Sequence, residues 1–118
     1  MKKIQRWPSS GTGRSRAVAF NNIIWIVASS LALSDDFENQ VKEIFSLATQ
    51  SLQQTGSGMG SILSVQVFLS DMIMKDKFDL LWNEWIGKDP DNWPQRTCIE
   101  ARLAPGLLVE MQLTAAVQ

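Results

Sequence analysis

The spacing of apolar residues along the chain predicts two amphipathic helices. In residues 36–53 and again in residues 74–86, large apolar side chains recur three and four positions apart, which is the period of one helix face. Asp35 precedes the first segment, and Glu38 stands three residues after Asp35. This spacing is typical of a capped helix start. We therefore expect a long first helix with Asp35 as its cap and a shorter second helix.

Short apolar runs, either alternating or continuous, predict five strands. They cover residues 16–20, 23–28, 62–69, 96–103 and 107–116. Asn21-Asn22 suits a two-residue hairpin turn, because Asn tolerates positive φ, and Pro105-Gly106 is a turn signal between the last two runs. Two strands, a helix, a strand, a helix and two strands indicate an α+β domain with a mixed sheet and both helices on one face.

Alternation in the last two predicted strands assigns each residue to one face of the sheet. The odd-numbered positions are apolar and are expected under the helices, whereas the even-numbered positions, which include Arg96, Cys98 and Glu110, form a mixed second face. If these strands pair as a hairpin, their even-numbered positions lie side by side. Phe68, and either Trp25 or its two strand neighbours, must also turn away from the helices. Such an exposed apolar face predicts a homo-oligomer with a site between subunits, where Arg96 and Glu110 meet a ligand.

Length and composition limit the class of protein. The chain has 118 residues, of which 45% are hydrophobic and 19% charged, so we expect residues 1–118 to form one globular domain. The net charge of −1 lacks the basic footprint of a nucleic-acid binder. The apolar run 23–28 is far shorter than the ~20 residues that span a bilayer, and no apolar segment follows Lys2 and Lys3 as in a signal peptide. With one unpaired thiol, Cys98, the protein is expected in the cytoplasm, without membrane or nucleic-acid partners.

The absence of histidine narrows the chemistry further. Without His there is no Ser-His-Asp or Cys-His catalysis, and one Cys cannot build a multi-cysteine zinc site. We expect no metal and no cofactor, so an enzyme of this sequence works with Arg, carboxylates, hydroxyls, one thiol and backbone groups. Trp82, Trp85 and Trp93 are interpreted as core and loop packing, because no basic patch accompanies them.

One segment near the C-terminus resembles a known family. Residues 96–103 read Arg-Thr-Cys-Ile-Glu-Ala-Arg-Leu, and Pro105-Gly106 and Leu108-Val109-Glu110 follow. This segment is similar to the C-terminal signature of the YjgF/RidA family of reactive imine/enamine deaminases, and the resemblance extends over almost the whole chain. It implies a chorismate-mutase-like α+β fold, a homotrimer, and a ligand cavity at each subunit interface.

The resemblance also implies an activity that needs no histidine. Family members hydrolyse imines and enamines from amino-acid metabolism, such as 2-aminoacrylate, to 2-keto acids and ammonia. By resemblance, Arg96 grips the substrate carboxylate through paired hydrogen bonds and Glu110 orients the attacking water. The backbone of Cys98 matches the position that lines the cavity and contacts the substrate.

Three expected pocket positions depart from the family pattern. A Ser-Gly-Gln triplet of the family reads Val27-Ala28-Ser29 here, a substrate-contacting Tyr is replaced near Arg14, and an Asn is replaced by Asp79. We therefore assign Arg14, Ala28, Ser29 and Asp79 to the substrate pocket beside Arg96 and Cys98, with Arg14 as a second cation for a larger or dianionic ligand. The alternative function is a non-catalytic Rid-like trimer that binds a small carboxylated metabolite.

Overall fold

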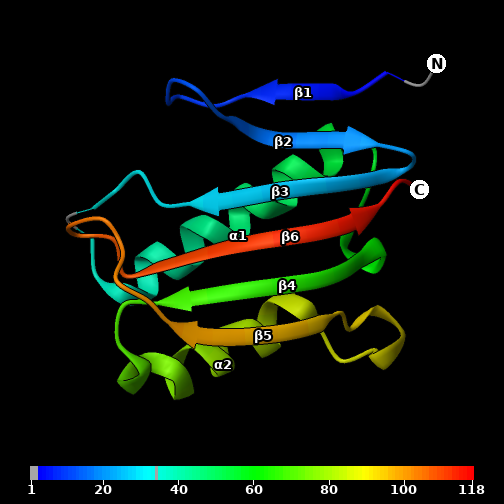
Figure 1. Ribbon diagram of the computed structural model, residues 1–118. Coiled ribbons are helices and arrows are strands. Elements are labelled where there is room, and N and C mark those ends of the chain that lie inside the picture. The colour runs from blue at the N-terminus through cyan, green and yellow to red at the C-terminus, as the bar shows by residue number, and fades with distance from the viewer. Residues whose placement is uncertain (1–2, 34) are drawn as a thin grey trace.

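The computed structural model describes residues 3–33 and 35–118 as a six-stranded sheet with two α-helices (Figure 1). The strands and helices in chain order are β1 (Gln5–Pro8), β2 (Ser15–Phe20), β3 (Ile23–Ser29), α1 (Phe37–Gln54), β4 (Ile62–Leu69), α2 (Lys75–Ile86), β5 (Gln95–Glu100) and β6 (Val109–Ala116). Short 3-10 turns precede β4, α2 and β5. The four-residue strand β1 was not predicted, because its polar residues and Pro8 give no alternating pattern.

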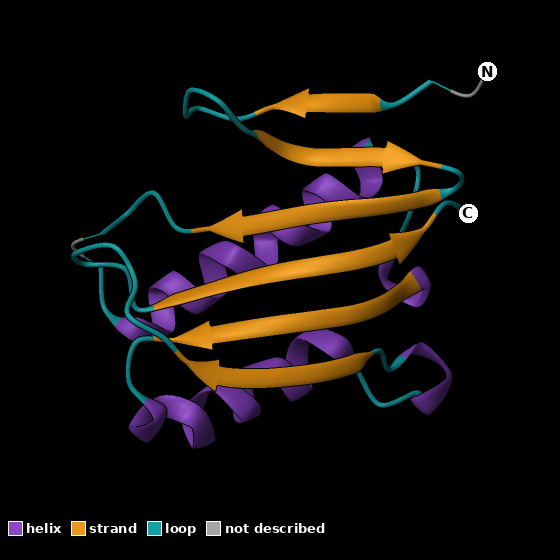
Figure 2. Ribbon diagram, viewed as in Figure 1, coloured by secondary structure: helices purple, strands orange, loops and turns teal. Residues whose placement is uncertain are grey.

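The strands are ordered β1-β2-β3-β6-β4-β5 across the sheet. All neighbours are antiparallel except β4 and β5, which run parallel with α2 as their crossover. Both helices lie on the same side of the sheet, behind it in the view of Figure 2. The predicted α+β class, with a mixed sheet covered by helices on one face, is therefore confirmed.

Local turn and cap chemistry explains where the first elements begin and end. Asn21 and Asn22 form the β2–β3 turn with φ of 55° and 66°, the left-handed conformation that a two-residue hairpin requires. Helix α1 starts after Asp36, whose carboxylate accepts a hydrogen bond of 2.9 Å from the Asn39 backbone N–H. The prediction of Asp35 as the cap was wrong by one residue, because Asp36 holds the extended backbone conformation of a cap.

The core lies between the sheet and the two helices. In β6 the predicted inner residues Val109, Met111, Leu113 and Ala115 are all 0% exposed, as the alternation predicted. In β3 the neighbours Ile24 and Ile26 are buried while Trp25 is 40% exposed, so Trp25 is the side chain that turns to the open face. Phe68 of β4 joins that open face, since it is paired with Glu110 between buried neighbours.

The expected hairpin of the last two strands is not formed. Strand β5 pairs with β4 at one edge of the sheet, and β6 inserts between β3 and β4. Residues 101–108 therefore form a loop that carries the chain across the end of β4, anchored by hydrogen bonds from Ala101 N to Leu69 O and from Ser70 N to Leu108 O. Pro105-Gly106 does form the predicted turn, but a turn does not specify which strand the chain joins next.

The predicted faces of β5 are also reversed. Arg96 and Cys98 are in register with the buried Val65 and Val67, so their side chains lie on the helix-covered face. Ile99, expected under the helices, is 51% exposed on the open face. The physical reason is that β5 is an edge strand covered only by the short α2, whose aromatic residues pack against a guanidinium as readily as against an aliphatic side chain.

Candidate functional site

Arg96 is held in a fixed orientation at the start of β5. Its guanidinium carbon lies 5.1 Å from the ring centroid of Trp82 and 5.7 Å from that of Phe78, within cation–π distance of both α2 side chains. Its Nη2 donates a hydrogen bond of 2.7 Å to Asp79 Oδ1. The side chain is 20% exposed, so the cation is oriented by the protein and still reaches solvent.

Asp79 carries a second ion pair that changes the charge balance around Arg96. Lys75 Nζ lies 2.7 Å from Asp79 Oδ2, one helical turn away on α2. Burial raises the pKa of Asp79, but the hydrogen bonds and charges of Lys75 and Arg96 outweigh it and leave that pKa below its ordinary value. With Asp79 ionised, two cations face one carboxylate, and the cluster keeps a net positive charge that favours an anionic ligand.

Cys98 is the next residue of β5 on the same face. Burial raises the pKa of its thiol, so the sulfur is protonated near neutral pH and is a poor nucleophile. The Ala101 N–H bonds to Leu69 O and therefore points toward β4. Since successive N–H groups of a strand point to opposite sides, the Cys98 N–H points away from β4, toward the free edge of the sheet. This N–H is an unpaired donor at the sheet edge, and contact of the Cys98 backbone with a substrate stays a prediction.

A hollow of about 370 Å³ opens beside Arg96 between α2 and the segment that leads into β5. The residues that line it are Asp79, Trp82, Asn83, Ile86, Trp93, Pro94 and Arg96. It thus combines a cation at one end with an apolar and aromatic wall. The prediction that Trp82 packs in the core is confirmed, since it is 7% exposed, and one of its edges also lines this hollow. Trp93 was predicted only to pack in a loop; the available signal for its place in the hollow was the position of Trp93-Pro94 just before Arg96 in the chain.

Glu110 and Ser29 lie on the other face of the sheet. They are direct partners in the β3–β6 register, and Glu110 is also paired with Phe68 of β4, so the three side chains share one row of the open face. Arg96 lies on the helix-covered face. The expectation that Arg96 and Glu110 share a face was therefore wrong for a single subunit, because the hairpin on which it depended is not formed.

Arg14 and Ala28 are also separate from Arg96. Arg14 is exposed in the loop between β1 and β2, at the opposite side of the strand order from β5, and its Nη1 bonds to Thr12 O at 3.4 Å. Ala28 is 1% exposed and lies beside Met111, so its methyl group points into the core. One subunit thus brings together Arg96, Asp79 and Cys98 and, on another face, Ser29 and Glu110.

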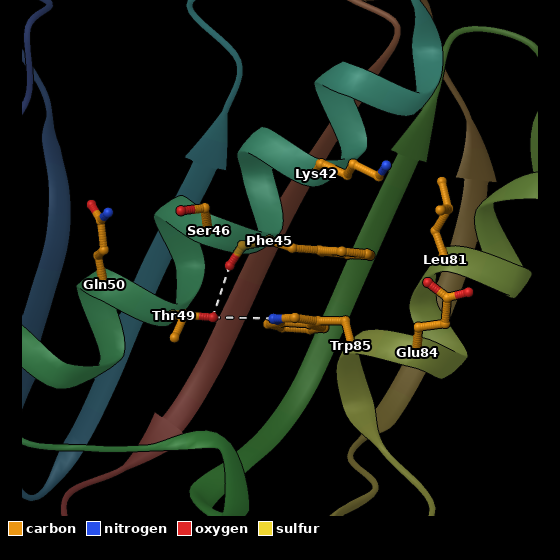
Figure 3. Close-up of a pocket in the computed structure, with 8 residues that line it drawn as sticks. All are labelled: Lys42, Phe45, Ser46, Thr49, Gln50, Leu81, Glu84 and Trp85. Atoms are coloured by element: carbon orange, nitrogen blue, oxygen red, sulfur yellow. Dashed lines mark hydrogen bonds between the residues drawn. The ribbon is translucent and has the colours of Figure 1, made fainter.

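A second hollow of about 460 Å³ lies between α1 and α2 (Figure 3). Its floor is the stacked pair Phe45–Trp85, whose ring centroids are 4.6 Å apart with an interplanar angle of 4°. Trp85 Nε1 donates to Thr49 Oγ at 3.1 Å, and the Thr49 hydroxyl donates to Phe45 O at 2.9 Å. These contacts join the two helices, and the hollow contains none of the residues predicted for the substrate site.

Two further features of the described residues bear on the class of site. Within residues 3–33 and 35–118, no three Cys, Asp or Glu side chains gather closely enough to hold a metal ion. In the same part of the chain, no helix combines the length and apolar character needed to cross a membrane.

Comparison with known proteins places this fold in a family. Residues 10–117 match the family model described as "Endoribonuclease L-PSP". A RutC family protein of Haemophilus ducreyi is 33% identical over 109 residues, which cover 90% of this chain and 92% of that protein.

Solved structures agree with this assignment. An uncharacterised protein of Pseudomonas aeruginosa is similar with a TM-score of 0.88 and 26% identity, covering 98% of this chain and 100% of the other. A member of the YjgF protein family from Neisseria meningitidis has a TM-score of 0.83 at 24% identity, covering 98% and 96% of the two chains, a likeness in fold. By its sequence and its architecture, the chain belongs to the YjgF/RidA family.

Proposed function

We propose that the protein hydrolyses imines and enamines of 2-keto acids, at sites between the subunits of a homotrimer. The observation that carries the proposal is the placement of Arg96, a cation fixed by Asp79 at 2.7 Å and by two aromatic rings at the mouth of a hollow. A guanidinium in this position binds a carboxylate through parallel hydrogen bonds, with the Cys98 N–H as a neighbouring donor. Membership of the YjgF/RidA family supports the same reading.

The reaction suits a site without histidine. An enamine first gains a proton at carbon and loses one from nitrogen, which makes it an imine. Water adds to the imine carbon; its oxygen loses a proton and the nitrogen gains one, which gives a carbinolamine. The carbinolamine hydroxyl then loses its proton while the nitrogen gains one and leaves as ammonia, so that a 2-keto acid remains. The C=N carbon is already electrophilic, so a carboxylate that orients the water is sufficient, and Glu110 has this role. Cys98 is not the nucleophile, in keeping with its raised thiol pKa.

The opposite placement of Arg96 and Glu110 requires that two subunits build each site. The open face that carries Glu110 also exposes Trp25, Val27 and Ile99, at 40%, 43% and 51%. Apolar side chains gathered on one face favour burial against further copies of the chain. In the proposed trimer, Arg96 of one subunit lies across the interface from Glu110 of the next. We assign the protein to the cytoplasm, where amino-acid metabolism releases such imines and a lone thiol stays reduced.

The activity is tested by following the loss of imines that an amino-acid oxidase or a pyridoxal-phosphate lyase generates in the same solution. We expect the protein to accelerate hydrolysis, and Arg96→Gln to lower kcat/KM by about 100-fold, because the substrate carboxylate is no longer positioned. Arg102→Gln, at an exposed arginine six residues further along the chain, is the matched control and should leave the rate unchanged. Acceleration that survives Arg96→Gln contradicts the site.

The two-subunit site is tested by co-expressing Arg96→Gln and Glu110→Gln chains, each inactive alone. In a ring of three subunits, every mixed trimer regenerates one intact site, so random mixing should restore about one quarter of the wild-type activity. If both residues served a site from the same subunit, mixing would restore none. Monomeric behaviour in light scattering would contradict the interfacial site altogether.

One observation favours the binding module as a second candidate. Asp79 already occupies a donor of Arg96, where the family resemblance leads us to expect an uncharged Asn. This contact weakens the grip of Arg96 on a substrate carboxylate. Calorimetric binding of a 2-keto acid to the wild-type protein, with no acceleration over buffer for any imine, would establish binding in place of catalysis.

A further inference from the structure

We infer that the site beside Arg96 selects ligands with a large apolar or aromatic side chain over ligands with a methyl or ethyl group. The inference rests on the proposed function and deepens it, since it names the class of 2-imino acid that the site takes. It is carried by the wall of the hollow of about 370 Å³, in which Trp82, Ile86, Trp93 and Pro94 lie beside the guanidinium.

Trp93 is the residue that makes this wall selective. Trp93 is 55% exposed, so much of its large apolar side chain is free to contact a ligand. Trp93 Nε1 donates a hydrogen bond of 2.9 Å to Gly87 O at the end of α2, so the ring is anchored. An anchored indole presents a flat apolar surface at little further cost in side-chain entropy.

The segment around Trp93 is built to hold that orientation. Asp89 caps the short turn Pro90–Asn92 by accepting from the Asp91 backbone N–H at 3.0 Å, and the Trp93 N–H bonds to Pro90 O at 3.1 Å. Pro94 follows and restricts the backbone on its other side. These contacts fix the backbone around Trp93, and with it the position of the indole relative to Arg96, the group that holds the ligand carboxylate.

The size of the hollow sets the side chain that fits. Its volume lies within the range of about 300–1,000 Å³ that is usual for small-molecule sites. A carboxylate on Arg96 with a methyl side chain would leave Trp93, which is 55% exposed, in contact with water, and its burial would contribute nothing to binding. A ring or a branched aliphatic chain would cover the indole of Trp93, and each apolar contact adds to affinity in proportion to the area removed from water.

The test compares two probes, pyruvate and phenylpyruvate, which share the 2-keto carboxylate and differ in the side chain. Isothermal titration of the wild-type protein should show phenylpyruvate binding about tenfold more tightly or better. Trp93→Ala should remove about that factor from phenylpyruvate and leave pyruvate unchanged. Trp93→Phe should keep most of the preference, and Leu80→Ala, which changes an exposed side chain of α2 outside the hollow, should keep all of it.

The outcomes separate this inference from the proposed function. Equal affinity for the two keto acids, or an equal loss of both in Trp93→Ala, overturns the selectivity while imine hydrolysis can still be measured. A tenfold preference that depends on Trp93, without turnover of the imines of alanine or phenylalanine, upholds the selectivity and refutes the enzyme. Binding of neither probe refutes the selectivity, and the imine assay then decides the proposed function by itself. The thermal transition of Trp93→Ala is recorded beside Trp93→Phe, whose binding ratio tests the selectivity if Trp93→Ala does not fold.

Discussion

The two helices cover the same face of the sheet, but the layers beneath them differ in chemistry. Under α1, strands β3 and β6 present aliphatic side chains that are fully buried, such as Ile24 and Leu113. Under α2, strand β5 presents the guanidinium of Arg96 against the rings of Phe78 and Trp82. An aliphatic layer stabilises by excluding water, whereas an oriented cation retains donors for an anion. The half under α1 is therefore an apolar core, whereas the half under α2 holds the oriented cation on which the proposed function rests.

The largest effect that this comparison predicts is on stability in the α1 half. Ile44 of α1 is 0% exposed, so Ile44→Ala leaves a cavity and should lower the free energy of unfolding by about 2–5 kcal/mol. Leu80→Ala, at a residue of α2 that is 68% exposed, should change it by less than about 0.5 kcal/mol. Urea denaturation of both variants gives the two values. Similar losses at the two positions would contradict the described burial.

A second stability effect concerns the one buried amide of α1. Gln40 is 0% exposed; its Nε2 donates to Gly106 O at 2.9 Å and its Oε1 accepts from the Leu108 N–H at 2.9 Å. It thereby fastens the 101–108 loop, which leads from β5 to β6, to the helix. Gln40→Leu leaves these backbone groups unpaired and should cost about 1–3 kcal/mol of unfolding free energy.

The matched control for the buried amide is Gln53→Leu, at an exposed position of the same helix. It should leave the unfolding free energy within about 0.5 kcal/mol of the wild type. Hydrogen exchange provides a second readout, because the Leu108 amide should lose protection in Gln40→Leu and keep it in the control. Unchanged protection of Leu108 in Gln40→Leu would show that the loop is held by other contacts.

The same comparison explains which elements could be predicted from the sequence. The alternation of β6 was decisive because β6 is a central strand with one face fully buried, so each inner position is apolar. β5 is an edge strand with a charged inner face, and its alternation of Thr97 and Ile99 against Arg96 gave the reverse answer. Alternation identifies a buried face only where both neighbours of a strand and the helix above it exclude water.

The candidate site shows a similar limit. Arg96 and Cys98 are two residues apart on one strand, so their common face followed from the period of a strand. The contact between Arg96 and Asp79 joins residues 17 positions apart and depends on how α2 docks on β5. The family resemblance named both residues, but the ion pair between them and the hollow at Trp93 follow from packing that no periodicity encodes.

The smallest predicted effect tests the charges of the α2 half through pH. The pKa of Asp79 is below its ordinary value, since the pull of Lys75 and Arg96 outweighs burial, so its ion pairs stabilise the fold above the unfolded pKa of about 3.9. That contribution is lost as the pH falls through the lower folded pKa. Asp79→Asn lacks it at every pH, so the wild type should be more stable near pH 6, by less than about 1 kcal/mol for such partly exposed pairs, and the difference should vanish near pH 2.

A double-mutant cycle attributes this pH dependence to the correct pair. The four proteins are the wild type, Asp79→Asn, Arg96→Met and the double variant, each melted over the same pH series. The coupling between Asp79 and Arg96, which are 2.7 Å apart, should be favourable near neutral pH and fall with the protonation of Asp79. A coupling that stays near zero at every pH would mean that packing of the Arg96 stem on Trp82, and not the charge of Asp79, holds the guanidinium in place. The α2 half would then hold its cation by apolar packing, the same kind of contact that holds the aliphatic side chains of the α1 half.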